Sequence, residues 1–255
     1  MDPGEIAFLA LAGFAAGLIG STAGLASLVS YPALLLVGLP PVTANVTNTV
    51  GLVGSSIGSV SGSRPELRGL GRLVLLALPV AVVGGTVGSV LLLEGPPGSF
   101  EKVVPFLVAL AAVLLLVSPR VRALGEGRRM SGDDGALGLG VTVLVFLCCV
   151  YGGYFGAAAG VMILAVLLSR TDRPLPVSNA LKNVFLGAAN ASAAVVFAFR
   201  APVEWAAVPA LLVGCILGGW LGPAVIRRVP EPVTRWTVGV AGLLLAVRLG
   251  WVAFT

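Results

Sequence analysis

Residues 6–63 contain no charged side chain, yet polar residues interrupt this apolar stretch twice. The first interruption is Ser21-Thr22, and the second is a cluster of hydroxyl and amide residues between Thr43 and Thr49. An uncharged stretch of this length suits the hydrocarbon core of a bilayer, which a helix crosses in about 20 residues. Irregular backbone at membrane depth is tolerated where it lines a site enclosed by protein. The stretch therefore predicts membrane helices that are interrupted around a binding site.

The composition is that of a helical membrane protein. Hydrophobic residues make up 57% of the sequence and charged residues 11%, whereas a soluble domain carries about 25% charge. The apolar runs are continuous, whereas a transmembrane β-barrel would alternate apolar and polar residues in segments of about 10. We therefore expect an all-α polytopic membrane protein in contact with the lipid bilayer. Arginine-rich cytoplasmic loops explain the net charge of +5 better than nucleic-acid binding does.

Charged residues divide the chain into apolar windows. The charge-free windows are 6–63, 73–93, 103–119, 135–169, 183–199, 205–226 and a shorter one after Arg235. Residues 135–169 are too few for two full spans and a turn, which need more than about 40 residues. They predict a re-entrant hairpin that returns to its starting side. We expect a similar hairpin over 6–38, with arms of about 13 to 15 residues on either side of a break at residues 21–23.

The two halves of the chain repeat one pattern. Three blocks match in order: Gly17, Gly20 and Gly24 with Gly153, Gly156 and Gly160; Pro41, Thr43 and Asn48 with Pro176, Ser178 and Asn183; Gly84, Gly85 and Gly88 with Gly218, Gly219 and Gly222. All offsets lie between 134 and 136 residues. Chance does not readily place three blocks in the same order at nearly constant offset. The sequence therefore predicts an internal repeat.

The repeat predicts a division of the chain into two structural halves. The first repeat covers 1–119, with a hairpin over about 6–38 and spans over about 42–62, 73–93 and 103–119. Residues 120–135 form a cytoplasmic linker. The second repeat covers 136–255, with a hairpin over about 136–169 and spans over about 176–199, 205–226 and 233–253. Each repeat would cross the membrane three times, an odd number, so the second should be inverted relative to the first.

The positions of the basic residues support this topology. With the N-terminus outside, the inner loops hold Arg64, Arg68, Arg72, Arg120, Arg122, Arg128, Arg129, Arg170, Arg173, Arg227, Arg228 and Arg235. The outer loops hold only Lys102 and Arg200. Cytoplasmic loops are enriched in Lys and Arg. We therefore expect a multi-pass protein of the cell (cytoplasmic) membrane with both termini external. The sequence leaves open whether it forms a homo-oligomer.

The two hairpin breaks are the first candidate binding elements. Ser21-Thr22-Ala23-Gly24 would begin the second half-helix of the first hairpin, and residues 157–160 that of the second. The N-terminus of a helix offers free N–H groups and a partial positive charge, which suits an anion. The alternative is that the glycines only allow close helix packing. For the matched glycines within 84–88 and 218–222 we favour packing.

Two polar stripes are the second set of candidates. Asn179, Asn183, Gly187 and Asn190 lie on one helical face, and Asn48, Gly51 and Ser55 form the matching stripe. Asn can solvate an oxyanion without permanent charge, although hydrogen bonding between helices is the alternative role. The candidate substrate-binding residues are Gly20, Ser21, Thr22, Gly24, Thr43, Thr47, Asn48, Ser55, Gly156, Gly160, Ser178, Asn179, Lys182, Asn183 and Asn190.

Lys182 is the one charged residue within a polar motif. It could pair with an anion, but we favour an ammonium that reaches back to the membrane interface. All acidic residues fall in loops or at the ends of spans, and the chain has no His. This argues against a proton relay through a buried carboxylate, and no pattern indicates an enzyme or a bound cofactor or metal. We interpret Cys148, Cys149 and Cys215 as core residues rather than as reactive thiols.

At these residues the chain resembles the sulfite exporter TauE/SafE family. The resemblance rests on Gly17-x-x-Gly20-x-x-x-Gly24, Pro32, Ala44-x-x-Thr47-Asn48 and the second glycine-rich copy, and it covers about residues 6–250. It implies movement of sulfite, sulfonates or related small organic anions. The second half departs from the pattern, because residues 156–160 are poorer in glycine and Lys182 stands where the first half has Thr47. An added cation could favour a more strongly charged anion.

Two functions remain open from the sequence. The first, which we favour, is a secondary transporter or uniporter for small sulfur-containing anions, with a site near the membrane midplane between the repeats. The second is a channel-like or accessory membrane protein whose polar stripes serve helix packing or assembly.

Overall fold

All regular structure in the described part of the chain is helical. The computed structural model describes residues 1–96, 98–125, 137–171 and 173–226, together with 236, 240, 243–244 and 246–251. In chain order these residues form α1 (Pro3–Ala23), α2 (Ser27–Leu36), α3 (Pro41–Gly62), α4 (Arg64–Leu67), α5 (Gly71–Glu94), α6 (Ser99–Gly125), α7 (Leu139–Tyr154), α8 (Ala159–Arg170), α9 (Leu175–Arg200) and α10 (Val208–Ile226). Residues 126–135 of the predicted linker and most of the predicted span 233–253 lie outside the described residues.

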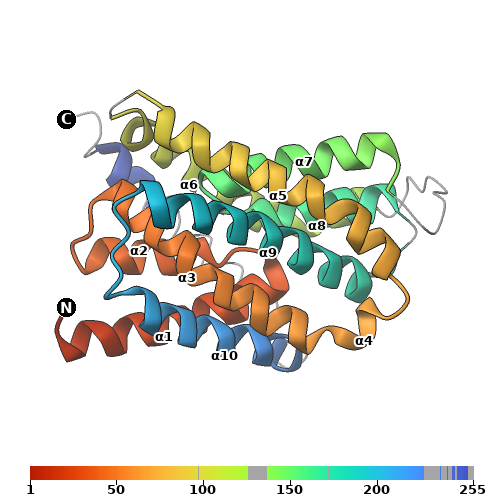
Figure 1. Ribbon diagram of the computed structural model, residues 1–255, viewed down its shortest axis with the longest axis horizontal. Coiled ribbons are helices and arrows are strands. Elements are labelled where there is room, and N and C mark those ends of the chain that lie inside the picture. Colours follow the sequence, from red (N-terminus) through yellow and green to blue (C-terminus); the bar gives the residue numbers. More distant parts are fainter. Residues whose placement is uncertain are drawn as a thin grey trace.

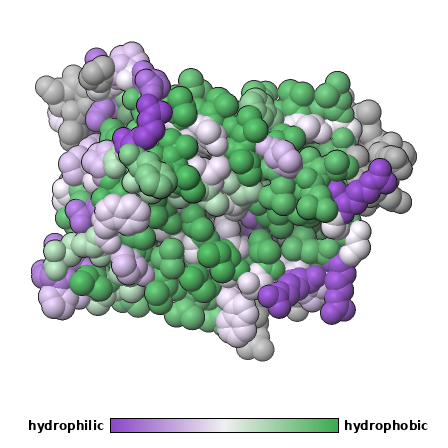
Figure 2. All heavy atoms as spheres, in the orientation of Figure 1, coloured by the Kyte–Doolittle hydropathy of each residue, from purple (hydrophilic) through white to green (hydrophobic). Residues whose placement is uncertain are grey.

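The fold is that of a membrane protein. By length and composition, α1, α5 and α9 can each cross a bilayer. Large apolar side chains along α5, such as Leu75, Leu76 and Leu91, are exposed. Figure 2 shows apolar side chains across the middle of one face and hydrophilic side chains gathered at its two ends. An apolar belt between polar ends is the surface that a bilayer solvates.

The helices follow one another across the molecule in an order that differs from the chain. α10 packs between α1 and α3, α3 packs on α9, and α5 packs between α9 and α7 (Figure 1). α5 of the first half therefore lies among helices of the second half, and α10 of the second half lies among helices of the first. The half-length helices α2 and α8 complete the interior, where α6 contacts both of them. This leaves α3 and α9 at the centre of the bundle.

Glycines set the distances between the outer helices. A Cβ at Gly218 of α10 would collide with the carbonyl oxygen of Phe14 on α1. A Cβ at Gly84 of α5 would lie 2.7 Å from the Cβ of Cys149 on α7. Small residues allow helix backbones to approach this closely in membranes. The matched glycines of α5 and α10 thus serve packing, as the sequence predicted, and all three cysteines are buried.

The first hairpin has unequal arms, contrary to the sequence prediction. α1 has 21 residues and α2 has 10, where two arms of about 13 to 15 were expected. Ser21 and Thr22 lie inside α1, where both hydroxyls donate to the Leu18 carbonyl of the preceding turn, at 3.0 and 2.9 Å. Hydroxyls bonded in this way are tolerated within a helix and do not end it. The break falls at residues 24–26.

Candidate functional site

The breaks of the two hairpins touch each other. Gly24 ends α1 in the left-handed conformation, with φ of 75°. A Cβ added there would lie 2.6 Å from the Cα of Gly160, and a Cβ added at Gly160 would lie 2.5 Å from the Cα of Gly24. In the second break, Gly156 and Ala158 are also left-handed, with φ of 77° and 68°. The helix starts that follow, α2 and α8, have no side-chain cap.

The end of α1 is held by α9, from the other half of the chain. The Lys182 ammonium donates to the carbonyl oxygens of Gly20 at 3.1 Å and Ser21 at 3.3 Å. Asn179 and Asn183 donate to the Ser21 carbonyl at 3.0 and 3.1 Å. The last carbonyls of a helix lack partners within the helix and carry partial negative charge. A cation and two amides therefore neutralise this helix end.

This arrangement corrects the expectation that Lys182 reaches back to the membrane interface. Lys182 is 0% exposed. Its ammonium instead contacts the Gly20 and Ser21 carbonyls in the last turn of α1, which satisfy a buried cation without exposing it to lipid. Ser21 and Thr22 belong to the last turn of α1 and do not begin α2. The second break does begin a helix as expected, since α8 starts at Ala159.

The end of α7 is held reciprocally by α3. The Asn45 amide donates to the Tyr154 carbonyl at 2.9 Å. The candidate residue Thr47 lies elsewhere, because its hydroxyl accepts from the Glu204 backbone N–H at 2.9 Å, in the connection before α10. Ser178, fully buried, donates to the Arg173 carbonyl at 3.3 Å. Thr43 is half-buried near the start of α3.

Asn48 holds the start of α2. Its side-chain oxygen accepts from the Ser30 hydroxyl, and its amide donates to the Ser27 hydroxyl at 3.1 Å. Asn48 is 1% exposed. Its hydrogen bonds serve the fold of the first hairpin.

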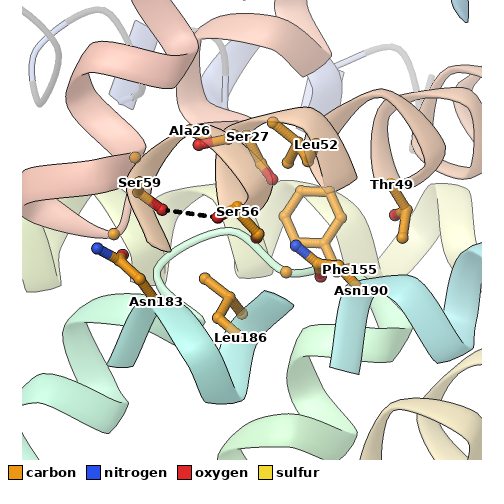
Figure 3. Close-up of a pocket in the computed structure, with 14 residues that line it drawn as sticks. Ala26, Ser27, Thr49, Leu52, Ser56, Ser59, Phe155, Asn183, Leu186 and Asn190 are labelled. Atoms are coloured by element: carbon orange, nitrogen blue, oxygen red, sulfur yellow. Dashed lines mark hydrogen bonds between the residues drawn. The ribbon is translucent and has the colours of Figure 1, made fainter. Parts of the chain in front are cut away.

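A cavity of about 20 Å³ lies between the breaks and the central helices α3 and α9 (Figure 3). The predicted residues that line it are Gly20, Gly24, Ser55, Gly156, Asn183 and Asn190. The predicted residues outside its lining are Ser21, Thr22, Thr43, Thr47, Asn48, Gly160, Ser178, Asn179 and Lys182. The lining residues not predicted are Ala26, Ser27, Thr49, Leu52, Ser56, Ser59, Phe155 and Leu186. This cavity brings together the two breaks and both stripes.

Two of the missed serines have a signal in the sequence. Ser59 lies four residues after Ser55 and continues the α3 stripe, and Ser56 lies beside Ser55. Phe155 has no such signal, since only the fold of the second break turns its ring to the cavity. Its ring packs edge-on to Tyr31 of α2, with centroids 5.4 Å apart.

The lining is polar and uncharged. Within the described chain, the side chains of Ser55, Ser56 and Asn190 form no hydrogen bond to protein and retain their donors. No charged side chain lines the cavity among the described residues. Leu52, Phe155 and Leu186 supply an apolar wall, with Leu186 drawn between Asn183 and Asn190 on α9 (Figure 3). The arrangement can donate hydrogen bonds to a small ligand.

A family model described as sulfite exporter TauE/SafE matches residues 9–249. The chain belongs to the TauE/SafE family. This TauE/SafE protein is 26% identical to a probable membrane transporter protein of Haemophilus influenzae, over 98% of its own length and 97% of the relative's. It is also 26% identical to the probable membrane transporter proteins ORF9 of a Sinorhizobium species and YfcA of Escherichia coli. These alignments cover 96% and 92% of this chain, and 92% and 85% of the two relatives. No solved structure matches it.

Members of this family are named as membrane transporters, not as enzymes. A transporter acts on a small-molecule substrate and works in a lipid environment, in agreement with the apolar helices of this TauE/SafE protein.

Proposed function

We propose that this protein is a secondary transporter or uniporter that moves small sulfur-containing anions, such as sulfite or sulfonates, across the cell membrane. The site is the cavity between the two hairpin breaks. The contact between Gly24 and Gly160 is the observation that carries the proposal. It brings the start of α2 and the start of α8 to one place, and residues that precede both starts line the cavity.

The electrostatics of the breaks favour an anion. A helix carries the equivalent of about half a positive charge at its N-terminus and half a negative charge at its C-terminus. The negative end of α1 is neutralised by Lys182, Asn179 and Asn183. The uncapped starts of α2 and α8 keep their positive ends. The Lys182 ammonium and the two helix starts outweigh the negative ends of α1 and α7, so the local balance around the cavity is positive, although no charged side chain among the described residues lines it.

We further propose that the chain consists of two inverted repeats, 1–119 and 136–255, joined by a cytoplasmic linker over 120–135. Reciprocal contacts support this division. α10 packs on α1 and α3, as α5 packs on α7 and α9. Asn179 and Asn183 hold the end of α1, as Asn45 holds the end of α7. A two-fold relation between the halves would produce both exchanges.

We propose that both termini are external. In Figure 1 the start of α1 and the helical residues 246–251 lie at one end of the molecule, and α4 lies at the other. The proposed cytoplasmic loops hold twelve arginines and the external loops two basic residues, by the sequence positions given above. The positive-inside rule puts the arginine-rich end in the cytoplasm.

We infer that transport proceeds by a change of conformation in which the two halves move apart at the breaks, because secondary transporters give alternating access around a fixed site. The proposed site lies between the two hairpin breaks. Export of an anion from a negative-inside cell gains about 2.3 kcal/mol per charge per 100 mV. A uniporter could run on this potential alone.

The second candidate function is a channel-like or accessory membrane protein. The hydrogen bonds of Asn45, Asn48 and Asn179 favour it, because these amides serve the fold and not a cavity. The two functions differ in whether the free side chains of the cavity matter to flux.

Sulfite and sulfonate flux in proteoliposomes at a set membrane potential distinguishes the two. Asn190→Ala removes a cavity amide that has no partner within the described residues. We expect it to reduce flux at least about tenfold, since one hydrogen bond to a charged ligand contributes about 1.5–3 kcal/mol. Ser61→Ala, on the exposed side of α3, is the control and should leave flux unchanged. Wild-type protein that moves no tested anion would favour the second function, and unchanged flux in Asn190→Ala would remove Asn190 from the site.

A further inference from the structure

The Lys182 ammonium is bound to the end of a broken helix at the core of the protein. Its nitrogen lies 3.1 Å from the Gly20 carbonyl oxygen and 3.3 Å from the Ser21 carbonyl oxygen. Lys182 is fully buried. Gly20 also lines the cavity, so the cation and the proposed anion site share one residue.

Carbonyl oxygens at the end of a half-helix have a second use in transporters. In several transporters with discontinuous helices, half-helix C-terminal ends and unwound carbonyls coordinate a coupling cation such as Na⁺. Neutral oxygens are suitable ligands for such hard cations. In this protein the ammonium of Lys182 lies at the C-terminal end of α1, a 21-residue helix that stops at the first break. We propose that Lys182 is a tethered internal cation, which takes the place of a coupling Na⁺ at the end of α1.

The second repeat shows that the fold of a hairpin does not by itself require this ammonium. The matched end of α7 receives an amide, from Asn45 to the Tyr154 carbonyl. The residue matched to Lys182 is Thr47, and its hydroxyl contacts the Glu204 backbone. The lysine is thus an addition specific to one of the two breaks, at the residues that neighbour the cavity.

A tethered cation has a consequence for transport, which rests on the proposed function. The ammonium neutralises the end of α1 in every conformation in which it keeps these bonds, and it does not cross the membrane. The first break then needs no dissolved cation to stay neutral. A variant that loses the ammonium but still fills its space should therefore respond to Na⁺ differently from a variant that loses the ammonium and leaves the space open.

The test is thermal unfolding of the purified protein in Na⁺ and in N-methyl-D-glucamine at equal ionic strength. Lys182→Ala and Lys182→Thr remove the ammonium and open room beside the Gly20 and Ser21 carbonyls. We expect both variants to unfold at lower temperature than wild type in N-methyl-D-glucamine, and Na⁺ to restore at least about 3 °C. Lys182→Met fills the same space without charge and should show no Na⁺ response beyond that of wild type. Lys102→Ala, at an exposed position, should behave as wild type.

Equal Na⁺ responses in Lys182→Ala and Lys182→Met would overturn the proposal, as would a wild-type response as large as that of Lys182→Ala. Failure of both Lys182→Ala and Lys182→Thr to fold in Na⁺, with Lys182→Met folded, would also overturn it. The readout does not depend on flux. If wild type moves no anion but Lys182→Ala gains the Na⁺ response, the proposed function fails and the tethered cation stands.

Discussion

The asparagines of the central helices divide into two roles at the level of single residues. Both the oxygen and the nitrogen of the Asn48 amide form hydrogen bonds to serine hydroxyls near the start of α2. Asn183 uses its donor on the Ser21 carbonyl while it also lines the cavity. Asn190 lines the cavity and has no partner in the described chain. Only the last of these is unconstrained by the fold and available for a ligand.

Asn48→Ala should therefore lower stability. The change leaves the buried hydroxyls of Ser27 and Ser30 without their amide partner. Lost buried hydrogen bonds of this kind cost about 1–2 kcal/mol in membrane proteins. Thermal unfolding in detergent measures the effect, with Ser61→Ala as the matched control, because that hydroxyl is exposed and bonds only within α3. Equal melting temperatures for Asn48→Ala and wild type would show that Asn48 does not hold α2.

Sequence reasoning recognised these polar residues but not the partner of each. Spacing along a helix places Asn48, Asn183 and Asn190 on inward faces, and the cavity confirms that face for the last two. Spacing carries no information about which residues from the other half lie opposite. The Gly20 and Ser21 carbonyls that Lys182 contacts lie more than 160 positions away in the chain, so the burial of Lys182 could not be deduced from local pattern.

At the scale of elements, the two hairpins depend on glycine for different reasons. Gly24 combines a left-handed backbone with a backbone contact to Gly160. Gly38, after α2, is also left-handed, with φ of 87°, but a Cβ there would meet nothing within 4 Å. The two positions share the conformational requirement and differ in the contact.

Gly24→Ala and Gly38→Ala separate these effects. A left-handed alanine costs about 1–2 kcal/mol at either position. At Gly24 the added methyl also overpacks the Gly160 backbone, which costs a further 1–3 kcal/mol by the order of magnitude known for cores. We expect Gly24→Ala to unfold at clearly lower temperature than Gly38→Ala. Similar melting temperatures for the two variants would mean that the breaks do not press together.

The sequence predicted the bounds of some long helices but not the arrangement of the helices. α3, α5 and α9 begin and end within two residues of the expected spans, because charged residues or prolines delimit them. α6 (Ser99–Gly125) extends beyond the expected span 103–119 at both ends. The first break was placed too early, because Ser21 and Thr22 hydrogen-bond within α1. α5 packs against helices of the second half and α10 against helices of the first. Both packings depend on glycine contacts between segments that are distant in the chain. A matched glycine pattern shows that such helices pack closely, but not with which partner.

At the scale of the whole molecule, the proposed inverted repeat predicts on which side of the membrane each loop lies. Matched segments of the two halves must face opposite sides of the membrane. Arg68 lies after α3, and Pro202 lies after the matched helix α9, at an offset of 134 residues. Both residues are exposed. The three native cysteines are buried, so a single introduced cysteine can report on its own side.

Labelling of Arg68→Cys and Pro202→Cys in intact cells tests whether these two positions lie on opposite sides of the membrane. A thiol reagent that cannot cross the membrane should label Pro202→Cys from outside and Arg68→Cys only after the membrane is opened. The reason is that an odd number of crossings separates matched positions, while the excess of arginine puts the Arg68 loop inside. The unsubstituted protein controls for the buried thiols and should remain unlabelled. Labelling of both positions from the same side would exclude the inverted repeat, and labelling of Arg68→Cys alone from outside would keep the repeat but reverse its orientation in the membrane.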